Sequence, residues 1–169
     1  MIFNFFKSKP TLKELIPERF VDIHSHVLPG IDDGAKNIQE SLTLISEMKK
    51  MGFTKIITTP HIHPGLYDNN YDTIEESFRL IKNKTTNLNF GAEYMFDRSL
   101  IETAQKGKLI CLKDNYFLIE MGFISEPINL FDLIFEIIMS GYIPIIAHPE
   151  RYLYLKGSGL KKAEKLKKM

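Results

Sequence analysis

The sequence has a single cysteine, Cys111, no apolar run that approaches the length of a membrane span, and no excess charge of either sign. A lone cysteine excludes an internal disulfide and a zinc site built from several thiolates, and it suits a reducing compartment such as the cytoplasm. The 22 Lys and Arg residues are balanced by 21 Asp and Glu residues, so global charge does not indicate nucleic-acid binding. We therefore expect a cytoplasmic protein with no membrane span and no nucleic-acid partner.

The first 18 residues differ from the rest in having a short apolar stretch, Met1 to Phe6, that Lys7 ends. This stretch is too short for a secretory signal sequence. Its phenylalanines could make a weak contact with a membrane or a partner, but a frayed arm is favoured because chain ends are seldom tied down. We expect an N-terminal arm over residues 1–18, with a short helix closed by Pro17, and one domain over residues 19–169.

Five apolar, β-branched segments, each followed by a helical pattern, predict an α/β fold. Strand and helix in alternation imply parallel strands with right-handed crossovers, in an open sheet or a barrel. The expected strands cover residues 20–23, 55–59, 89–94, 116–121 and 143–147.

Helix signals between and after these strands support the same alternation. Asn37 and Glu40 predict the start of the first long helix, and Gly52 predicts its end. Pro127 is expected to open a helix that is buried on nearly every face except one polar stripe. The lysine-rich tail after Gly157 predicts a final amphipathic helix with a solvated face.

A histidine or a carboxylate stands at the C-terminal end of every expected strand. The carboxyl ends of parallel strands converge on one rim in a barrel, so these side chains should meet. Buried carboxylates and imidazoles without partners are costly, so the set calls for a cation, and zinc, manganese or iron(II) would suit it. The expected metal ligands are His24, His26, His61, Glu93, Glu120 and His148.

Four other polar residues near these positions receive weaker interpretations. His63 lies beyond a strand end and is expected to be a loop residue. Asp32 and Asp33 precede Gly34 and are expected to form a turn. Asp22 could orient a ligand from behind or hold the loop.

Five ordered motifs carry a resemblance to a known family. Asp22-Ile-His-Ser-His26, Thr59-Pro-His61, Gly91-Ala-Glu93, Leu118-Ile-Glu120 and Ala147-His-Pro-Glu-Arg-Tyr152 resemble the motifs of the polymerase and histidinol phosphatase (PHP) superfamily. Together with Ile31-Asp-Asp-Gly34, they are most similar to those of the bacterial manganese-dependent protein tyrosine phosphatases of capsule and exopolysaccharide loci.

The resemblance implies a distorted (β/α)7 barrel with up to three divalent metals, Mn2+ first and Fe2+, Zn2+ or Mg2+ as alternatives. The six ligands above would hold them, with Glu93 bridging, and Arg151, Glu120 and His148 would act in catalysis, Arg151 on the substrate phosphate. A metal-bound hydroxide would attack the phosphorus of a phosphotyrosine protein, and no phosphoenzyme would be needed. The phosphotyrosine protein is expected to be a bacterial tyrosine kinase. The sequence argues against a cysteine-dependent phosphatase, because that class places an arginine six residues after the cysteine and Phe117 stands there.

The chain departs from the family in ending before two further strands and a late Asp-x-His motif. We expect a PHP-like domain over residues 19–169 that is incomplete at its C-terminus, with about five strands and an exposed edge at residues 143–147. Such a fragment should have weak activity or none. Two other functions stay open: a phosphatase of a small metabolite such as histidinol phosphate, and an inactive barrel fragment that binds metal or a partner protein. The oligomeric state is open.

Overall fold

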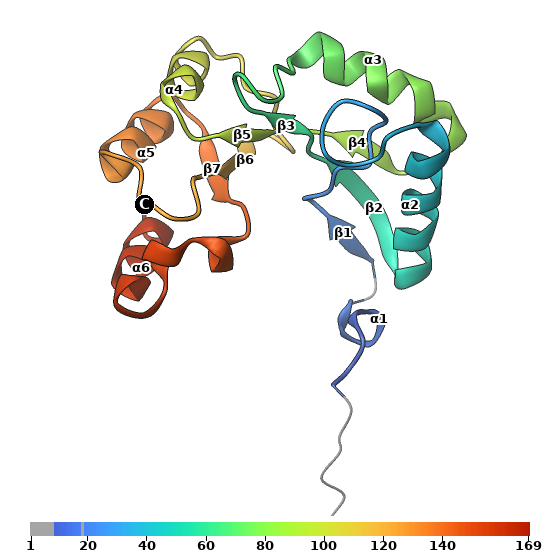
Figure 1. Ribbon diagram of the computed structural model, residues 1–169, viewed down its shortest axis with the longest axis horizontal. Coiled ribbons are helices and arrows are strands. Elements are labelled where there is room, and N and C mark those ends of the chain that lie inside the picture. The colour runs from blue at the N-terminus through green and yellow to red at the C-terminus, as the bar shows by residue number, and fades with distance from the viewer. Residues whose placement is uncertain (1–8, 18) are drawn as a thin grey trace, which may run out of the picture.

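The computed structural model describes residues 9–17 and 19–169, in which strands and helices alternate along the chain (Figure 1). Residues 1–8 and 18 of the expected N-terminal arm, including its phenylalanines, lie outside the described residues. The strands are β1 (Phe20–Asp22), β2 (Phe53–Thr58), β3 (His61–Ile62), β4 (Leu88–Phe90), β5 (Glu93–Met95), β6 (Tyr116–Glu120) and β7 (Ile143–Ile146). The helices are α1 (Leu12–Leu15), α2 (Ile38–Met51), α3 (Tyr71–Ile81), α4 (Arg98–Gln105), α5 (Leu130–Met139) and α6 (Leu160–Lys167), with 3-10 turns η1 (Lys82–Lys84), η2 (Pro149–Arg151), η3 (Leu153–Leu155) and η4 (Gly157–Gly159).

All pairs between these strands are parallel, in two sheets of order β1-β2-β4 and β3-β5-β6-β7. β2 and β3 belong to one stretch of chain, and so do β4 and β5, so the seven short strands occupy five positions. The predicted α/β class with parallel strands is therefore confirmed, and each of the five predicted segments contains strand structure.

The chain breaks at the same level between β2 and β3 and between β4 and β5, and the second break interrupts the strand predicted over residues 89–94. Between β2 and β3 stands Pro60, which has no N–H to give to a sheet. Between β4 and β5 stands Gly91, where a Cβ would lie 2.8 Å from the Leu112 side chain and 3.3 Å from its backbone. The chain at Leu112 therefore passes close to Gly91, and a larger residue at position 91 would require Leu112 to shift. The single strand expected over residues 89–94 is wrong in this respect, because close backbone approach is not visible in a local pattern.

Helix α2 begins and ends where the sequence predicts, whereas α5 begins later than predicted. Asn37 caps α2 by accepting the Glu40 N–H at 3.0 Å, and Gly52 ends it with φ 115°. α5 begins at Leu130 rather than at Pro127, because the residues between form a turn in which the Leu130 N–H donates to the Pro127 carbonyl.

The core lies between the sheets and their helices, and it includes Ile56 of β2, Ile74 of α3 and Phe117 of β6, each no more than 1% exposed. The expectation that α5 is buried on nearly every face is wrong. Phe135 and Met139 are 56% and 69% exposed, since α5 packs against α4 and β7 through its other side. An apolar helix surface thus reaches solvent.

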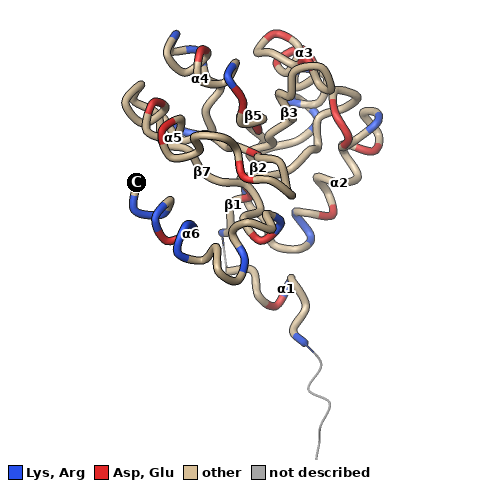
Figure 2. Tube along the Cα trace, turned by 60° about the vertical axis from the view of Figure 1, so that its left-hand side comes forward, with Lys and Arg blue, Asp and Glu red and all other residues tan. Residues whose placement is uncertain are grey.

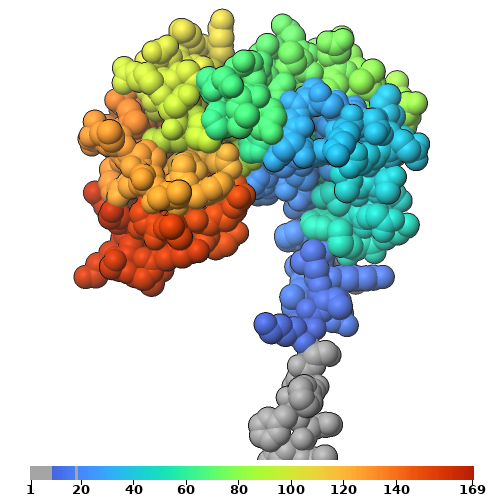
Figure 3. All heavy atoms as spheres, in the orientation of Figure 1, coloured from blue at the N-terminus to red at the C-terminus, as the bar shows by residue number. Residues whose placement is uncertain are grey.

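The chain curves into an arch rather than a closed ring. In the described residues, β1 and β7 each pair on one side only, so both present a free edge, as expected for residues 143–147. Figure 3 shows the N-terminal and C-terminal limbs standing apart with an open hollow between them. An apolar cavity of about 590 Å³ lies between α5, β7 and α6, away from the carboxylates. Figure 2 shows the lysines along α6 and mixed charges elsewhere. None of the described helices is both long and apolar enough to cross a bilayer.

Candidate metal centre

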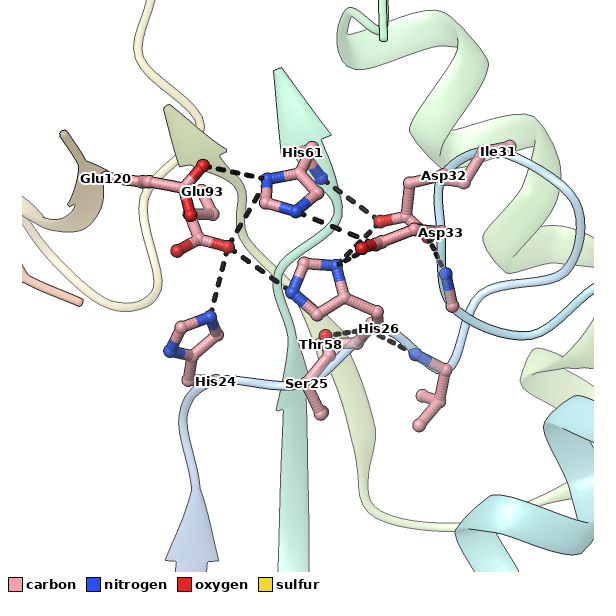
Figure 4. A network of polar contacts seen from close by, with 12 residues as sticks. His24, Ser25, His26, Ile31, Asp32, Asp33, Thr58, His61, Glu93 and Glu120 are labelled. Atoms are coloured by element: carbon pink, nitrogen blue, oxygen red, sulfur yellow. Dashed lines mark hydrogen bonds and ion pairs between the residues drawn. The ribbon is translucent and has the colours of Figure 1, made fainter. Parts of the chain in front are cut away.

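The six residues expected to be ligands come together where the strands are interrupted or end. His61 in β3 and Glu93 in β5 are direct cross-strand partners. Glu120 closes β6, whereas His24, His26 and His148 stand in the loops that follow β1 and β7. Figure 4 shows the three imidazoles of His24, His26 and His61 directed at the two glutamates. The break before β5 therefore places the Glu93 carboxylate at the start of a short strand rather than in the middle of a longer one.

Glu93 is the centre of the cluster and is 0% exposed. Its Oε2 lies 3.0 Å from His24 Nε2, 3.3 Å from His26 Nε2 and 3.4 Å from His61 Nδ1. Its Oε1 lies 3.2 Å from His148 Nε2. Four imidazoles from four separate positions in the chain thus converge on one buried carboxylate.

Glu120 extends the cluster on one side. It is 8% exposed, and its Oε2 lies 3.2 Å from His148 Nε2 while its Oε1 lies 3.9 Å from His61 Nδ1. His148 therefore stands between the two carboxylates. Its backbone has φ 30°, a strained conformation for a residue other than glycine, and such strain is often kept at functional sites.

The loop that carries His24 and His26 is joined to the end of β2. The Ser25 carbonyl accepts both the Thr59 N–H and the Thr58 hydroxyl at 2.7 Å, and the Val27 N–H donates to the Thr58 hydroxyl oxygen. Asp22 accepts the Ser25 hydroxyl at 2.6 Å, so its contact favours the loop-holding interpretation of this residue. Both histidines are consequently positioned by backbone contacts on either side of them.

Asp32 does more than the turn expected from its sequence context. It accepts the Gly34 N–H at 3.0 Å, as a turn-forming aspartate does, but its other oxygen lies 2.7 Å from His26 Nδ1 and accepts the His61 N–H. An outer carboxylate on the far nitrogen fixes the orientation of an imidazole ligand. Sequence reasoning missed this role, because a turn carboxylate and an orienting carboxylate share one local pattern.

Asp33 and Tyr67 were also missed as neighbours of the site. Asp33 Oδ1 lies 3.6 Å from His61 Nε2, and the Tyr67 ring stacks on the His61 ring with centroids 5.4 Å apart. Only the family-like run ending in Gly34 could have indicated Asp33, whereas Tyr67 reaches the site through a turn closed by its pairing with His63.

Two groups of the cluster, His26 and Glu93, have strongly shifted pKa values in the metal-free protein. Burial by itself would lower the pKa of His26, yet its hydrogen bonds to Asp32 and Glu93 outweigh burial and raise this pKa to about 10. Burial would raise the pKa of Glu93, but hydrogen bonds from His24 and His26 hold it well below its usual range. His26 is therefore protonated and Glu93 ionised at neutral pH when no metal is present.

The residues present fit divalent cations. Three groups have donor atoms within 4.8 Å of one another: His24, His26 and Glu93; His26, Asp33 and His61; and His61, Glu93 and Glu120. Each pair of groups shares one residue, so neighbouring ions could share ligands. The buried Nδ1 of His148 has no hydrogen-bond partner, which leaves this imidazole under-satisfied. Imidazole and carboxylate donors without thiolates suit Mn2+, Fe2+ or Zn2+.

Two residues considered from the sequence lie outside these groups. His63 belongs to none of them in the described part of the chain, and its N–H donates to the Tyr67 carbonyl. Arg151 is exposed at the end of η2, with its guanidinium carbon 4.0 Å from the centre of the Phe123 ring. The structure thus brings the six expected ligands together and leaves Arg151 one aromatic ring away, since Phe123 also contacts His148.

Gly34 is expected to support metal binding, because a Cβ there would lie 2.0 Å from the His26 carbonyl oxygen. Gly34→Ala should displace His26 and lower Mn2+ affinity about ten-fold or more, as loss of a supporting contact does. Isothermal titration calorimetry would measure the affinity. Gly122→Ala is the control, since its Cβ would meet its nearest atom at 3.8 Å. Equal affinities of the two variants would contradict this view of the loop.

Metal binding at pH 7 should release a proton from His26, because this residue has a raised pKa and a metal requires the neutral imidazole. Affinity should therefore rise with pH by about ten-fold per unit from this residue alone, until pH approaches its pKa. Calorimetry in buffers of different ionisation enthalpy counts the released protons. His63→Ala should leave the count unchanged, and a count near zero at pH 7 would contradict the release of a proton from His26 on metal binding.

Comparisons with known proteins agree with this geometry. The family described as capsular polysaccharide synthesis, CpsB/CapC, matches residues 20–169. CapC of Staphylococcus aureus, described as a putative tyrosine-protein phosphatase, and the tyrosine-protein phosphatase YwqE of Bacillus subtilis are 33% and 35% identical over 138 residues, which is 78% of this chain and 54% of each relative. The chain thus spans about half the length of these relatives.

A solved structure gives the same result. It comes from a study of YwqE of Bacillus subtilis and CpsB of Streptococcus pneumoniae, described there as metal-dependent tyrosine phosphatases. It matches with a TM-score of 0.74 and 29% identity, over 87% of this chain and 62% of that chain. The predicted likeness to the capsule-locus tyrosine phosphatases is confirmed. Because the family match covers residues 20–169, this chain belongs to the CpsB/CapC family of capsular polysaccharide synthesis.

Proposed function

We propose that this chain carries the metal centre of a protein tyrosine phosphatase that depends on Mn2+ rather than on a cysteine. The observation that supports this most directly is the convergence of four imidazoles on the buried Glu93 carboxylate, with Glu120 beside it. The names of the relatives add the reaction, because YwqE and the streptococcal CpsB proteins are tyrosine-protein phosphatases.

The proposed substrate is a phosphotyrosine protein, in particular a bacterial tyrosine kinase of capsule or exopolysaccharide synthesis. The family description names capsular polysaccharide synthesis, and a tyrosine kinase acting in that process would supply a phosphotyrosine protein as the substrate. The proposed location is the cytoplasm, where the enzyme would encounter the phosphorylated tyrosine of such a kinase.

The chemistry follows from the charge of the substrate. A phosphotyrosine carries close to two negative charges at neutral pH, and bound divalent cations would neutralise them and activate a water molecule as the nucleophile. Glu93, Glu120 and His148 would hold these cations from one side. Arg151 would donate two N–H groups to phosphoryl oxygens, which a planar guanidinium does well. Because the water molecule would attack phosphorus directly and displace the tyrosine phenolate, this mechanism needs no phosphoenzyme.

The single cysteine is unsuited to be the nucleophile. Burial raises the pKa of the Cys111 thiol, which keeps it protonated, whereas a nucleophilic cysteine needs a lowered pKa. Its Sγ lies 3.7 Å from the Leu109 carbonyl oxygen, and Phe117 stands where an arginine would be required.

Replacing this cysteine should therefore leave the reaction intact. Cys111→Ser is expected to hydrolyse para-nitrophenyl phosphate with a specificity constant within about two-fold of the wild type, while a chelator abolishes the reaction in both proteins. Steady-state colorimetric assays with and without added Mn2+ measure the two effects. Loss of activity in this variant would overturn the metal mechanism.

The proposed function is tested by measuring Mn2+ binding and turnover together, because the chain spans about half the length of its relatives. Glu93→Gln should lower Mn2+ affinity by about ten-fold or more, since it removes the shared charge of the cluster. Glu102→Gln, on the exposed face of α4, is the matched control and should bind as wild type does. Equal binding by both variants would contradict the site.

Substrate class is decided by comparing a phosphotyrosine peptide with histidinol phosphate on the Mn2+-loaded chain. Faster turnover of the peptide supports the tyrosine phosphatase, and faster turnover of histidinol phosphate supports a metabolite phosphatase. Tight Mn2+ binding without hydrolysis of either would mean that this chain by itself is an inactive metal-binding barrel fragment.

A further inference from the structure

The Arg151 guanidinium forms no ion pair with the described residues, and it lies over the ring of Phe123. In the part of the chain that the structure describes, no carboxylate lies within ion-pair distance of its guanidinium. Its carbon Cζ lies 4.0 Å from the centre of the Phe123 ring, well within cation–π range. A phenyl ring accepts no conventional hydrogen bond, so this contact leaves guanidinium N–H groups of Arg151 free to bind an anion.

Phe123 is itself held firmly from behind. Its ring stacks on Tyr152 with centroids 5.8 Å apart, and Tyr152 is fully buried with its hydroxyl oxygen accepting the Met121 N–H. The Phe123 carbonyl accepts the Leu153 N–H at 2.9 Å. The loop after β6 and the turns after β7 are therefore tied together at this ring.

The same ring reaches the proposed metal centre. Phe123 meets His148 with an interplanar angle of 62° and ring centroids 5.6 Å apart, and His148 Nε2 lies 3.2 Å from both Glu93 and Glu120. One aromatic ring thus contacts an imidazole that faces the carboxylates and the arginine that stands outside them. The backbone supports this arrangement, because the Arg151 N–H donates to the His148 carbonyl at 2.9 Å.

We propose that Phe123 is a positioning residue, which holds the Arg151 guanidinium beside the metal centre so that its N–H groups meet phosphoryl oxygens. This inference rests on the proposed function. A free arginine side chain on the surface loses much rotational freedom when it binds an anion. Stacking on a fixed ring removes that freedom before the substrate arrives, which strengthens phosphate binding without a new contact to the phosphate.

Two constants test the proposal, and the first of them is measured without turnover. The first is the dissociation constant of phenylphosphonate, a non-hydrolysable aryl phosphate mimic, measured by NMR titration of the Mg2+-loaded chain. The second is the Michaelis constant for para-nitrophenyl phosphate, measured together with kcat on the Mn2+-loaded chain. Phe123→Leu should raise both constants about two- to five-fold, the size of one exposed cation–π contact, with a smaller change in kcat.

Three further variants separate positioning from a merely structural role. Phe123→Tyr keeps the ring and should restore wild-type affinity. Phe135→Leu removes an exposed phenylalanine of α5 and should change neither constant. In an Arg151→Ala background, Phe123→Leu should have no additional effect, because there is no guanidinium left to hold.

The outcomes distinguish this inference from the proposed function. Normal phenylphosphonate binding by the wild type together with unchanged binding in Phe123→Leu would overturn the positioning role alone. An equal effect of Phe123→Leu with and without Arg151 would also overturn it, since the ring would then act by another route. A metal-loaded wild type that binds no phenylphosphonate would overturn the proposed function and this inference together.

Discussion

The buried carboxylate of Glu93 organises more of this structure than any other single group. A carboxylate withdrawn from water must be paired, and here its partners are imidazoles from four positions along the chain. Protons on the imidazoles can balance its charge in the metal-free protein, as the raised pKa of His26 shows. Divalent cations would replace those protons, because the donor atoms are already gathered.

The backbone is broken where this cluster needs it. Pro60 and Gly91 interrupt two neighbouring strands at one level, so that His61 and Glu93 begin new short strands side by side. Gly34 lets the His26 loop fold back upon itself without space for a side chain. Pro60 and Gly91 make the pairing of the sheets less regular, and Gly34 tightens the loop beside them, so that the polar side chains reach a common rim.

The two halves of the site are supported differently. Asp32 orients His26 and accepts the His61 N–H, so the histidine side is held by a polar network. Arg151 is held by aromatic stacking on Phe123 instead. A stacked cation keeps its hydrogen-bond donors for a ligand, whereas a salt bridge would occupy them. The histidine side is therefore suited to binding cations, and Arg151 is suited to binding an anion.

The α/β class, the five strand positions, the capped helix after Asn37 and the six residues that meet at the rim could all be predicted from the sequence, because alternation and strand-end residues are local signals. The strand break at Gly91, the orienting role of Asp32 and the exposure of Phe135 could not. Nor could the stacking of Arg151 on Phe123. Only the tertiary structure decided these features. Each depends on which distant segment packs against the residue, and a local sequence pattern does not specify that neighbour.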